Sequence, residues 1–227
     1  MGPDSDTPLH DMNPTGRFSD RVHDYAAHRP DYPTAAWDAV LESMDRERLT
    51  VADVGAGTGI SALQLATALG GSSRVLAIEP NPAMRSAMPV HERIVAMDGA
   101  AERLPLGSGT VDLIVCAQSF HWFVPEPTLG EFARVVRPGG RVALVWNERD
   151  DSDPLTARYG AAIRAASGNH PAEKRADHFV HLRDSLLFSG YRSLRFGHAQ
   201  RLRGAPGLIG RAASSSYVPR SGPLRDA

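Results

Sequence analysis

A glycine-dense turn directly after a short apolar run is the part of the sequence best suited to bind a ligand. The run Val51–Val54 leads into Gly55, Gly57 and Gly59, which occupy alternate positions. Glycine leaves the backbone uncovered, so a ligand can lie against bare peptide groups. A second apolar run ends in Glu79, where a carboxylate can accept hydrogen bonds from two ribose hydroxyls. Together the two features predict a nucleoside-binding site.

The spacing of the glycines separates the classes of nucleoside cofactor. A dinucleotide turn needs a third glycine at the position of Ile60, and a triphosphate loop ends in Lys and Ser or Thr, whereas Ile60 follows Gly59 and the chain has a single lysine, Lys174. A nucleoside cofactor without phosphate remains. S-adenosylmethionine fits, because its carboxylate can use free amides at a helix N-terminus while its ammonium and sulfonium groups tolerate Asp53. A nicotinamide oxidoreductase, supported by the glycine turn and Glu79, stays as the less favoured class.

Several ordered segments resemble one enzyme superfamily. Residues 53–59 look like motif I of class I S-adenosylmethionine-dependent methyltransferases, and residues 79–84 are similar to the acidic segment that follows it. Further matches follow in order at 99–105 (the adenine-side loop), 111–115 (the fourth strand) and 134–140 (the turn before the fifth). Residues 25–33, 119–123 and 146–150 resemble the small-molecule group that includes trans-aconitate methyltransferase. The resemblance covers residues 17 to 220.

This resemblance implies a methyltransferase that acts on a small molecule by O-methylation, with a carboxylate as one candidate acceptor. The glycine turn and the resemblance together predict these cofactor-binding residues: Tyr25, Arg29, Asp53, Gly55, Gly57, Gly59, Glu79, Pro80, Met84, Ala101, Glu102 and Gln118. The predicted substrate pocket contains Tyr32, His121, Trp122, Trp146 and Asn147. No metal site is expected, since His178 and His181 have no third ligand beside them in the sequence.

Methyl transfer from a sulfonium requires few catalytic side chains, because the donor is already activated. The enzyme holds the acceptor and excludes water, and a base is needed only where the acceptor must lose a proton. His121, flanked by aromatic residues, is the candidate base, and a histidine that merely orients its loop is the alternative. The resemblance also implies that the segment 25–33 folds over the donor, with Arg29 placed for a carboxylate of cofactor or substrate.

Composition agrees with a single enzyme domain. The chain has 227 residues, of which 42% are hydrophobic and 22% charged, enough to bury one core. A formal net charge of −1 gives no reason to expect nucleic acid or an anionic membrane as a partner. The single cysteine, Cys116, is expected to be a buried structural thiol. Without a membrane-length apolar run or a signal core, the cytoplasm is the expected location.

Strands alternate with helical stretches from Val51 onward, which predicts an α/β fold with a Rossmann-like parallel sheet and helices on both faces. The expected strands are 51–54, 74–79, 93–97, 111–117 and 141–147. The expected helices are 34–45 with Thr34 as N-cap, 59–69, one begun by Asn81 and Pro82, 126–136 and 208–217. Because such sheets bind ligands at the carboxyl ends of their strands, Gly55, Glu79, Gln118 and Trp146 should converge on one crevice.

The expected domain organisation is a flexible tail over 1–16, one domain over 17–220 with an N-terminal lid region at 17–46, and a loose end at 221–227. A sixth strand is expected near 193–203, and Ser214–Tyr217 is similar to the family's S-x-S-Y. No alternating apolar run follows for the final antiparallel strand, so the fifth strand should keep an unpaired edge. We therefore expect a homodimer or a poorly soluble protein. A donor-binding protein with little or no turnover is the alternative function.

Overall fold

The computed structural model describes residues 8–12, 16, 22–170 and 179–218. Two compact units can be distinguished among them. The first comprises 31–146 and 179–199, and the second the described residues of 1–30, 147–170 and 200–218. The predicted loose end 221–227 and most of the predicted tail 1–16 lie outside the described residues, so the domain limits stay a prediction.

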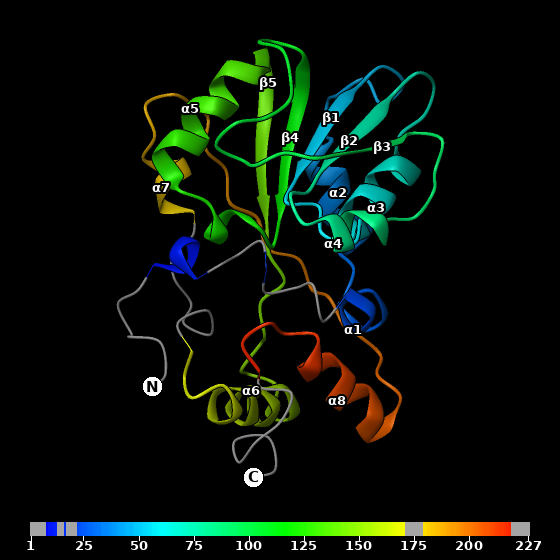
Figure 1. Cartoon of the computed structure of the whole chain (residues 1–227), viewed down its shortest axis with the longest axis vertical. Coiled ribbons are helices and arrows are strands. Elements are labelled where there is room, and N and C mark those ends of the chain that lie inside the picture. Colours follow the sequence, from blue (N-terminus) through cyan, green and yellow to red (C-terminus); the bar gives the residue numbers. More distant parts are fainter. Residues whose placement is uncertain (1–7, 13–15, 17–21, 171–178, 219–227) are drawn as a thin grey trace. The chain divides into compact units, whose positions relative to one another are not determined.

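The first unit contains a sheet of five parallel strands in the order β3-β2-β1-β4-β5 (Figure 1). The strands are β1 (Thr50–Val54), β2 (Arg74–Ile78), β3 (Ile94–Met97), β4 (Val111–Ala117) and β5 (Val136–Val145). β1 pairs with β2 along its whole length and with β4 from Val51↔Leu113 to Asp53↔Val115. The order reverses between β1 and β4, where open α/β sheets bind ligands. The prediction of a Rossmann-like parallel sheet is confirmed.

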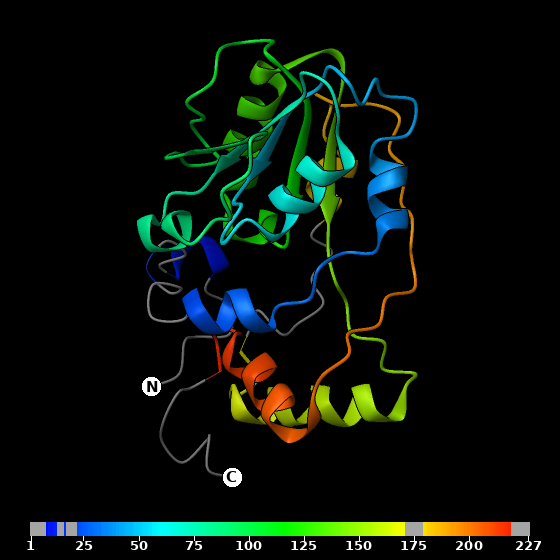
Figure 2. The same ribbon diagram turned by 90° about the vertical axis from the view of Figure 1, so that its right-hand side faces the viewer.

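Helices cover both faces of the sheet (Figures 1 and 2). On one face α2 (Thr34–Val40) and α3 (Ile60–Ala68) pack through Trp37 and Leu65 against strand residues such as Val115. On the other face α5 (Pro125–Val135) packs through Phe132 against Ile114. Neighbouring residues of β4 thus enter different cores, because successive side chains of a strand point to opposite faces. The continuous apolar run of β4 follows from burial on both sides.

The first predicted helix, 34–45, is present but ends earlier than predicted. α2 ends at Val40, and Thr34 is its first helical residue; Pro33 occupies the N-cap position without a side-chain cap. The positive φ of Ser43, +62°, is incompatible with a continued right-handed helix. Met44 instead donates its N–H to the carbonyl of Leu41 at 3.1 Å, in a separate turn.

The predicted sixth strand is wrong. Residues 189–203 have no regular secondary structure, and no further strand follows β5 in the described part of the chain. A strand is stable only when a neighbour accepts and donates its backbone hydrogen bonds. The segment instead makes surface contacts: an ion pair from Arg192 to Glu42 at 2.7 Å, and an approach of His198 Nε2 to Asp31 Oδ1 at 3.2 Å.

The remaining elements are mostly short. The first unit also has α4 (Pro82–Ser86), η2 (Phe120–Trp122) and α7 (Val180–Arg183). The second unit contains η1 (Leu9–Asp11), α1 (Val22–His28), α6 (Pro154–Ala166) and α8 (Gly204–Ala213). α6 is not among the helices expected from the sequence, and its N-cap Asp153 accepts the N–H of Thr156 at 2.8 Å. α8 begins and ends about one turn before the predicted 208–217.

Two leucines of α3 test how the sheet is held against its helices. Leu65 is fully buried, whereas Leu63 is 38% exposed. We expect Leu65→Ala to lower the free energy of unfolding by about 2–5 kcal/mol, through lost burial and a cavity. The matched Leu63→Ala should change it by less than about 1 kcal/mol. Urea unfolding of both variants measures the difference, and equal losses would contradict this packing.

Candidate functional site

The glycine turn after β1 has a backbone conformation that favours glycine. Three of its residues lie in the left-handed region, which glycine adopts at little cost: Gly55 (φ +70°), Gly57 (+58°) and Gly59 (+82°). The N–H groups of Gly55 and Ala56 both donate to the carbonyl of Ile78, at 2.9 and 3.1 Å. These bonds tie the turn to the carboxyl end of β2.

The turn also lies close to the loop that follows β4. A Cβ on Gly55 would approach the Cβ of Ser119 to 2.6 Å, so even alanine would displace the loop. Ser119 donates from Oγ to the carbonyl of Val54 at 2.7 Å. Gln118 has a positive φ of +58° and donates its N–H to the carbonyl of Val145 at 2.9 Å. The ends of β1, β4 and β5 are therefore bonded to one another where the sheet order reverses.

Asp53 is a fully buried carboxylic acid at the end of β1. Its Oδ2 accepts a hydrogen bond from the Ser61 hydroxyl at 2.6 Å, while its Oδ1 has no partner among the described residues. Burial raises the pKa of Asp53 to about 7, against the lowering effect of the Ser61 bond. An acid that titrates near neutrality beside a ligand-binding turn is characteristic of functional sites.

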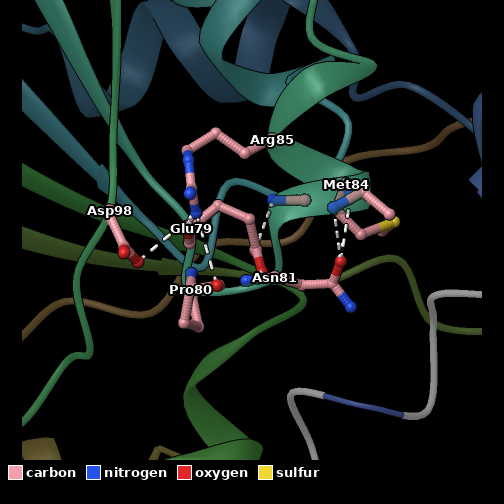
Figure 3. Close-up of polar contacts among 8 residues, drawn as sticks. Glu79, Pro80, Asn81, Met84, Arg85 and Asp98 are labelled. Carbon is pink, nitrogen blue, oxygen red and sulfur yellow. Dashed lines mark hydrogen bonds and ion pairs between the residues drawn. The ribbon is translucent and has the colours of Figure 1, made fainter.

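Glu79 follows β2, and its carboxylate lies beside the glycine turn (Figure 3). Its Oε2 accepts the N–H of Gly57 at 2.9 Å and its Oε1 accepts the N–H of Asn81 at 2.8 Å. The residue is 8% exposed, and burial raises its pKa against the two backbone bonds. A carboxylate offers about four acceptor positions. Two bonds from the backbone therefore leave capacity for two hydroxyl donors of a ligand.

The loop carrying Glu79 is braced from two sides (Figure 3). Arg85 donates from Nη1 to the carbonyl of Glu79 at 2.6 Å and to that of Pro80 at 3.3 Å, and it pairs with Asp98 at 3.3 Å. Asn81 caps α4, with its Oδ1 accepting the N–H groups of Ala83 and Met84. The prediction that Asn81 and Pro82 begin a helix is confirmed, and Met84 is buried inside it.

The loop after β3 contains two further predicted cofactor residues. Ala101 is buried. The side chain of Glu102 accepts the N–H of Val124 at 2.9 Å, which connects this loop to the start of α5. These contacts give Glu102 a structural role within the first unit.

His121 and its aromatic neighbours lie in η2 after β4. Trp146 donates from Nε1 to Nδ1 of His121 over a long 3.4 Å. The His121 ring centroid lies 4.9 Å from that of Trp122, and Trp146 packs edge-on against Phe179 at 4.8 Å. The structure thus brings three of the predicted pocket residues together: His121, Trp122 and Trp146.

Of the other two predicted pocket residues, Tyr32 belongs to the core of the first unit and Asn147 to the second unit. Tyr32 is buried in the core, where its ring packs edge-on against Trp37 at 5.3 Å and its backbone exchanges two hydrogen bonds with Gln64. Asn147 belongs to the second unit, as do Tyr25 and Arg29 from the cofactor set. Within that unit the Arg29 guanidinium lies over the Tyr25 ring at 4.8 Å and donates to the carbonyl of Ser214 at 3.1 Å. His178 lies outside the described residues.

Three residues of this region were not predicted as site residues. Ser61 bonds to Asp53, Ser119 bonds to Val54, and Arg85 braces the Glu79 loop. Ser61 could have been suspected, because it lies in the first turn of the helix that follows the glycine turn. No sequence pattern marks Arg85, whose role depends on where α4 folds back.

The sheet order, the glycine turn after β1 and the carboxylate at the end of β2 are those of Rossmann-like nucleoside-binding folds, to which the class I methyltransferase fold belongs. The more particular assignment comes from related sequences. Residues 52–144 match the family model described as a methyltransferase domain. This part of the chain is thus similar in sequence to methyltransferase domains.

Named relatives extend the similarity beyond that segment. An uncharacterized methyltransferase of Mycobacterium tuberculosis (strain ATCC 25618 / H37Rv) is 41% identical over 138 residues, which are 59% of this chain and 53% of that protein. An uncharacterized methyltransferase-like protein of Schizosaccharomyces pombe is 32% identical over 176 residues, 77% of this chain and 66% of that protein. A solved structure described as a candidate type II methyltransferase from Anaeromyxobacter dehalogenans is 29% identical, with a TM-score of 0.51, and the match covers 61% of this chain and 60% of that one. The chain spans about half the length of its mycobacterial relative.

The described helices are all too short or too polar to cross a lipid bilayer.

The buried acid Asp53 should make stability depend on pH. Its pKa is about 7 in the folded protein and near the ordinary 3.8 when unfolded. Between these values the unfolded chain has lost a proton that the folded protein keeps, so the free energy of unfolding falls as pH rises. A gap of this size corresponds to a loss of about 4 kcal/mol.

We expect Asp53→Asn to remove the part of the pH dependence of stability that comes from Asp53. The variant should gain stability relative to the natural chain as pH rises from about 4 to 7, and the difference should be constant above that window. Urea unfolding at pH steps measures it. Asp38→Asn, at an exposed acid, is the control. Parallel curves for Asp53→Asn and the natural chain would contradict a raised pKa.

Proposed function

We propose that this chain is an S-adenosylmethionine-dependent methyltransferase that methylates an oxygen of a small molecule, with a carboxylate as the preferred acceptor. The observation that carries the proposal is the Glu79 carboxylate, which two backbone N–H groups hold beside the glycine turn while acceptor capacity remains. The methyltransferase family match of residues 52–144 supports the reaction class.

The residues present fit this cofactor. Glu79 has free acceptor positions for ribose hydroxyls, and Asp53 has a buried Oδ1 without a partner, which suits a positively charged group. Gly57, whose N–H bonds to Glu79, has no side chain that would cover the backbone beside this carboxylate. Pro80, on the loop after Glu79, and Met84, in α4, are proposed to line the nucleoside. Ala101, Glu102 and Gln118 complete the proposed set in this unit.

S-adenosylmethionine supplies an activated methyl group, so the protein's own task is to hold the acceptor and exclude water. We propose that Trp122 and Trp146 form an aromatic wall for this purpose, with His121 between them. Because Nδ1 of His121 accepts from Trp146, the neutral ring carries its proton on Nε2. In this tautomer the basic lone pair of the ring, on Nδ1, already accepts the hydrogen bond from Trp146. The geometry favours a positioning role and a carboxylate acceptor over base catalysis.

Glu79 provides the direct test of donor binding. Glu79→Ala should weaken S-adenosylmethionine affinity about ten- to a hundredfold, through lost hydrogen bonds to a charged group of about 1.5–3 kcal/mol. The affinity of Glu79→Gln for S-adenosylmethionine should lie between those of Glu79→Ala and the natural chain, since the amide keeps one oxygen acceptor. Isothermal titration calorimetry measures each affinity, and the exposed Glu92→Ala is the control. Unchanged affinity in a folded Glu79→Ala protein would overturn the cofactor assignment.

His121 tests the type of acceptor. A carboxylate has already lost its proton near neutral pH. His121→Ala should therefore raise the acceptor KM about fivefold, the effect of one neutral hydrogen bond, while the shape of the kcat profile against pH stays the same. Trp146→Phe, which keeps an aromatic ring but frees Nδ1, is the companion variant. If His121→Ala removes an ionisation near pH ~6.5, base catalysis on a hydroxyl acceptor is the correct mechanism instead.

A further inference from the structure

The loop that carries the Glu79 carboxylate is bonded to a single residue at three successive carbonyls. Arg85, in the last turn of α4, donates from Nη1 to the carbonyl of Glu79 at 2.6 Å and to that of Pro80 at 3.3 Å. Its backbone N–H donates to the carbonyl of Asn81 at 2.9 Å. The same Nη1 lies 3.3 Å from Oδ1 of Asp98, directly after β3 (Figure 3). Arg85 therefore holds three consecutive peptide groups of this loop.

One of these peptide groups joins the Arg85 guanidinium to the Glu79 carboxylate. The carbonyl of Pro80 and the N–H of Asn81 belong to the same peptide group. Its carbonyl accepts from Arg85, and its N–H donates to Oε1 of Glu79 at 2.8 Å. A peptide group is planar, so holding its oxygen also sets the direction of its N–H. Hydrogen bonds in such a chain also polarise one another, so Arg85 acts on the carboxylate through this peptide group.

The charge of Arg85 acts on the same carboxyl group. Burial raises the pKa of Glu79, and the two backbone N–H bonds and the positive charge of Arg85 lower it, whereas the negative charge of Asp98 raises it. Asp53 is a second buried acid beside Glu79. Among these charged groups Arg85 favours the ionised carboxylate, which is the form that accepts hydrogen bonds with both oxygens.

We propose that Arg85 is a positioning residue for ribose recognition, which holds the Glu79 carboxylate so that its remaining acceptor positions meet two neighbouring hydroxyls of a nucleoside. Two hydroxyls are bound together only when the carboxylate has a fixed direction, because hydrogen bonds weaken steeply when donor and acceptor are misaligned. The inference rests on the proposed function, since the nucleoside is part of the methyl donor. Arg85 should therefore matter for a ribose that has its hydroxyls and little for one that lacks them.

Paired titrations with two ligands test this selectivity. S-adenosylhomocysteine has both ribose hydroxyls, and its 2′,3′-dideoxy analogue has neither. In isothermal titration calorimetry we expect Arg85→Met to weaken binding of S-adenosylhomocysteine about tenfold and binding of the analogue less than about twofold. Arg46→Met, which removes an exposed arginine paired with Asp38 in the same unit, should leave both affinities unchanged. An equal loss for both ligands would mean that Arg85 only supports the fold of the loop, and would overturn the proposal.

A double-mutant cycle separates failure of this inference from failure of the proposed function. If Arg85 acts through Glu79, Arg85→Met should weaken binding of S-adenosylhomocysteine less than about twofold in a Glu79→Ala background. Losses that simply add would overturn the role of Arg85, while the effect of Glu79→Ala alone would still support the donor site. If the natural chain binds S-adenosylhomocysteine no better than the dideoxy analogue, the proposed function fails, and this inference fails with it.

Circular dichroism checks that the variants fold. Should Arg85→Met fail to fold, Arg85→Gln is the second variant, because it keeps a polar N–H donor but has no charge. It should weaken binding of S-adenosylhomocysteine at least about threefold more than binding of the analogue. The same loss for the two ligands in this variant would overturn the proposal.

Discussion

Two hydrogen bonds to the carboxylate of Glu79 organise the candidate site. The N–H of Gly57 comes from the turn after β1 and the N–H of Asn81 from the start of α4, so one side chain sets the distance between two loops. Both loops depend on the parallel pairing of β1 with β2, which brings Val54 and Ile78 to the same edge of the sheet. A carboxylate is suited to this task because it accepts from both loops and keeps acceptor positions for a ligand.

This arrangement places two acids in a poorly hydrated region. Burial raises the pKa of both Asp53 and Glu79, and their proximity raises that of Asp53 further. The structure opposes these shifts with the Ser61 hydroxyl and with backbone N–H groups. Burying two acids costs free energy, and packing alone would favour apolar residues at these positions. The buried acids are therefore one reason to regard the site as functional.

The sequence by itself determined the sheet, the glycine turn and the position of Glu79, because each depends on local composition: apolar runs of strand length, glycines that accept positive φ, and an acid at a strand end. It could not determine the end of α2, set by the positive φ of Ser43, or the absence of a strand at 193–203, since a strand exists only through its neighbour. Nor could it place Arg85 under the Glu79 loop, bury Tyr32 against Trp37, or bring Arg211 to Arg29 across 182 positions. The first two contacts join residues only a few positions apart and the third joins residues far apart, but in each case the fold of the intervening chain decides which side chains meet.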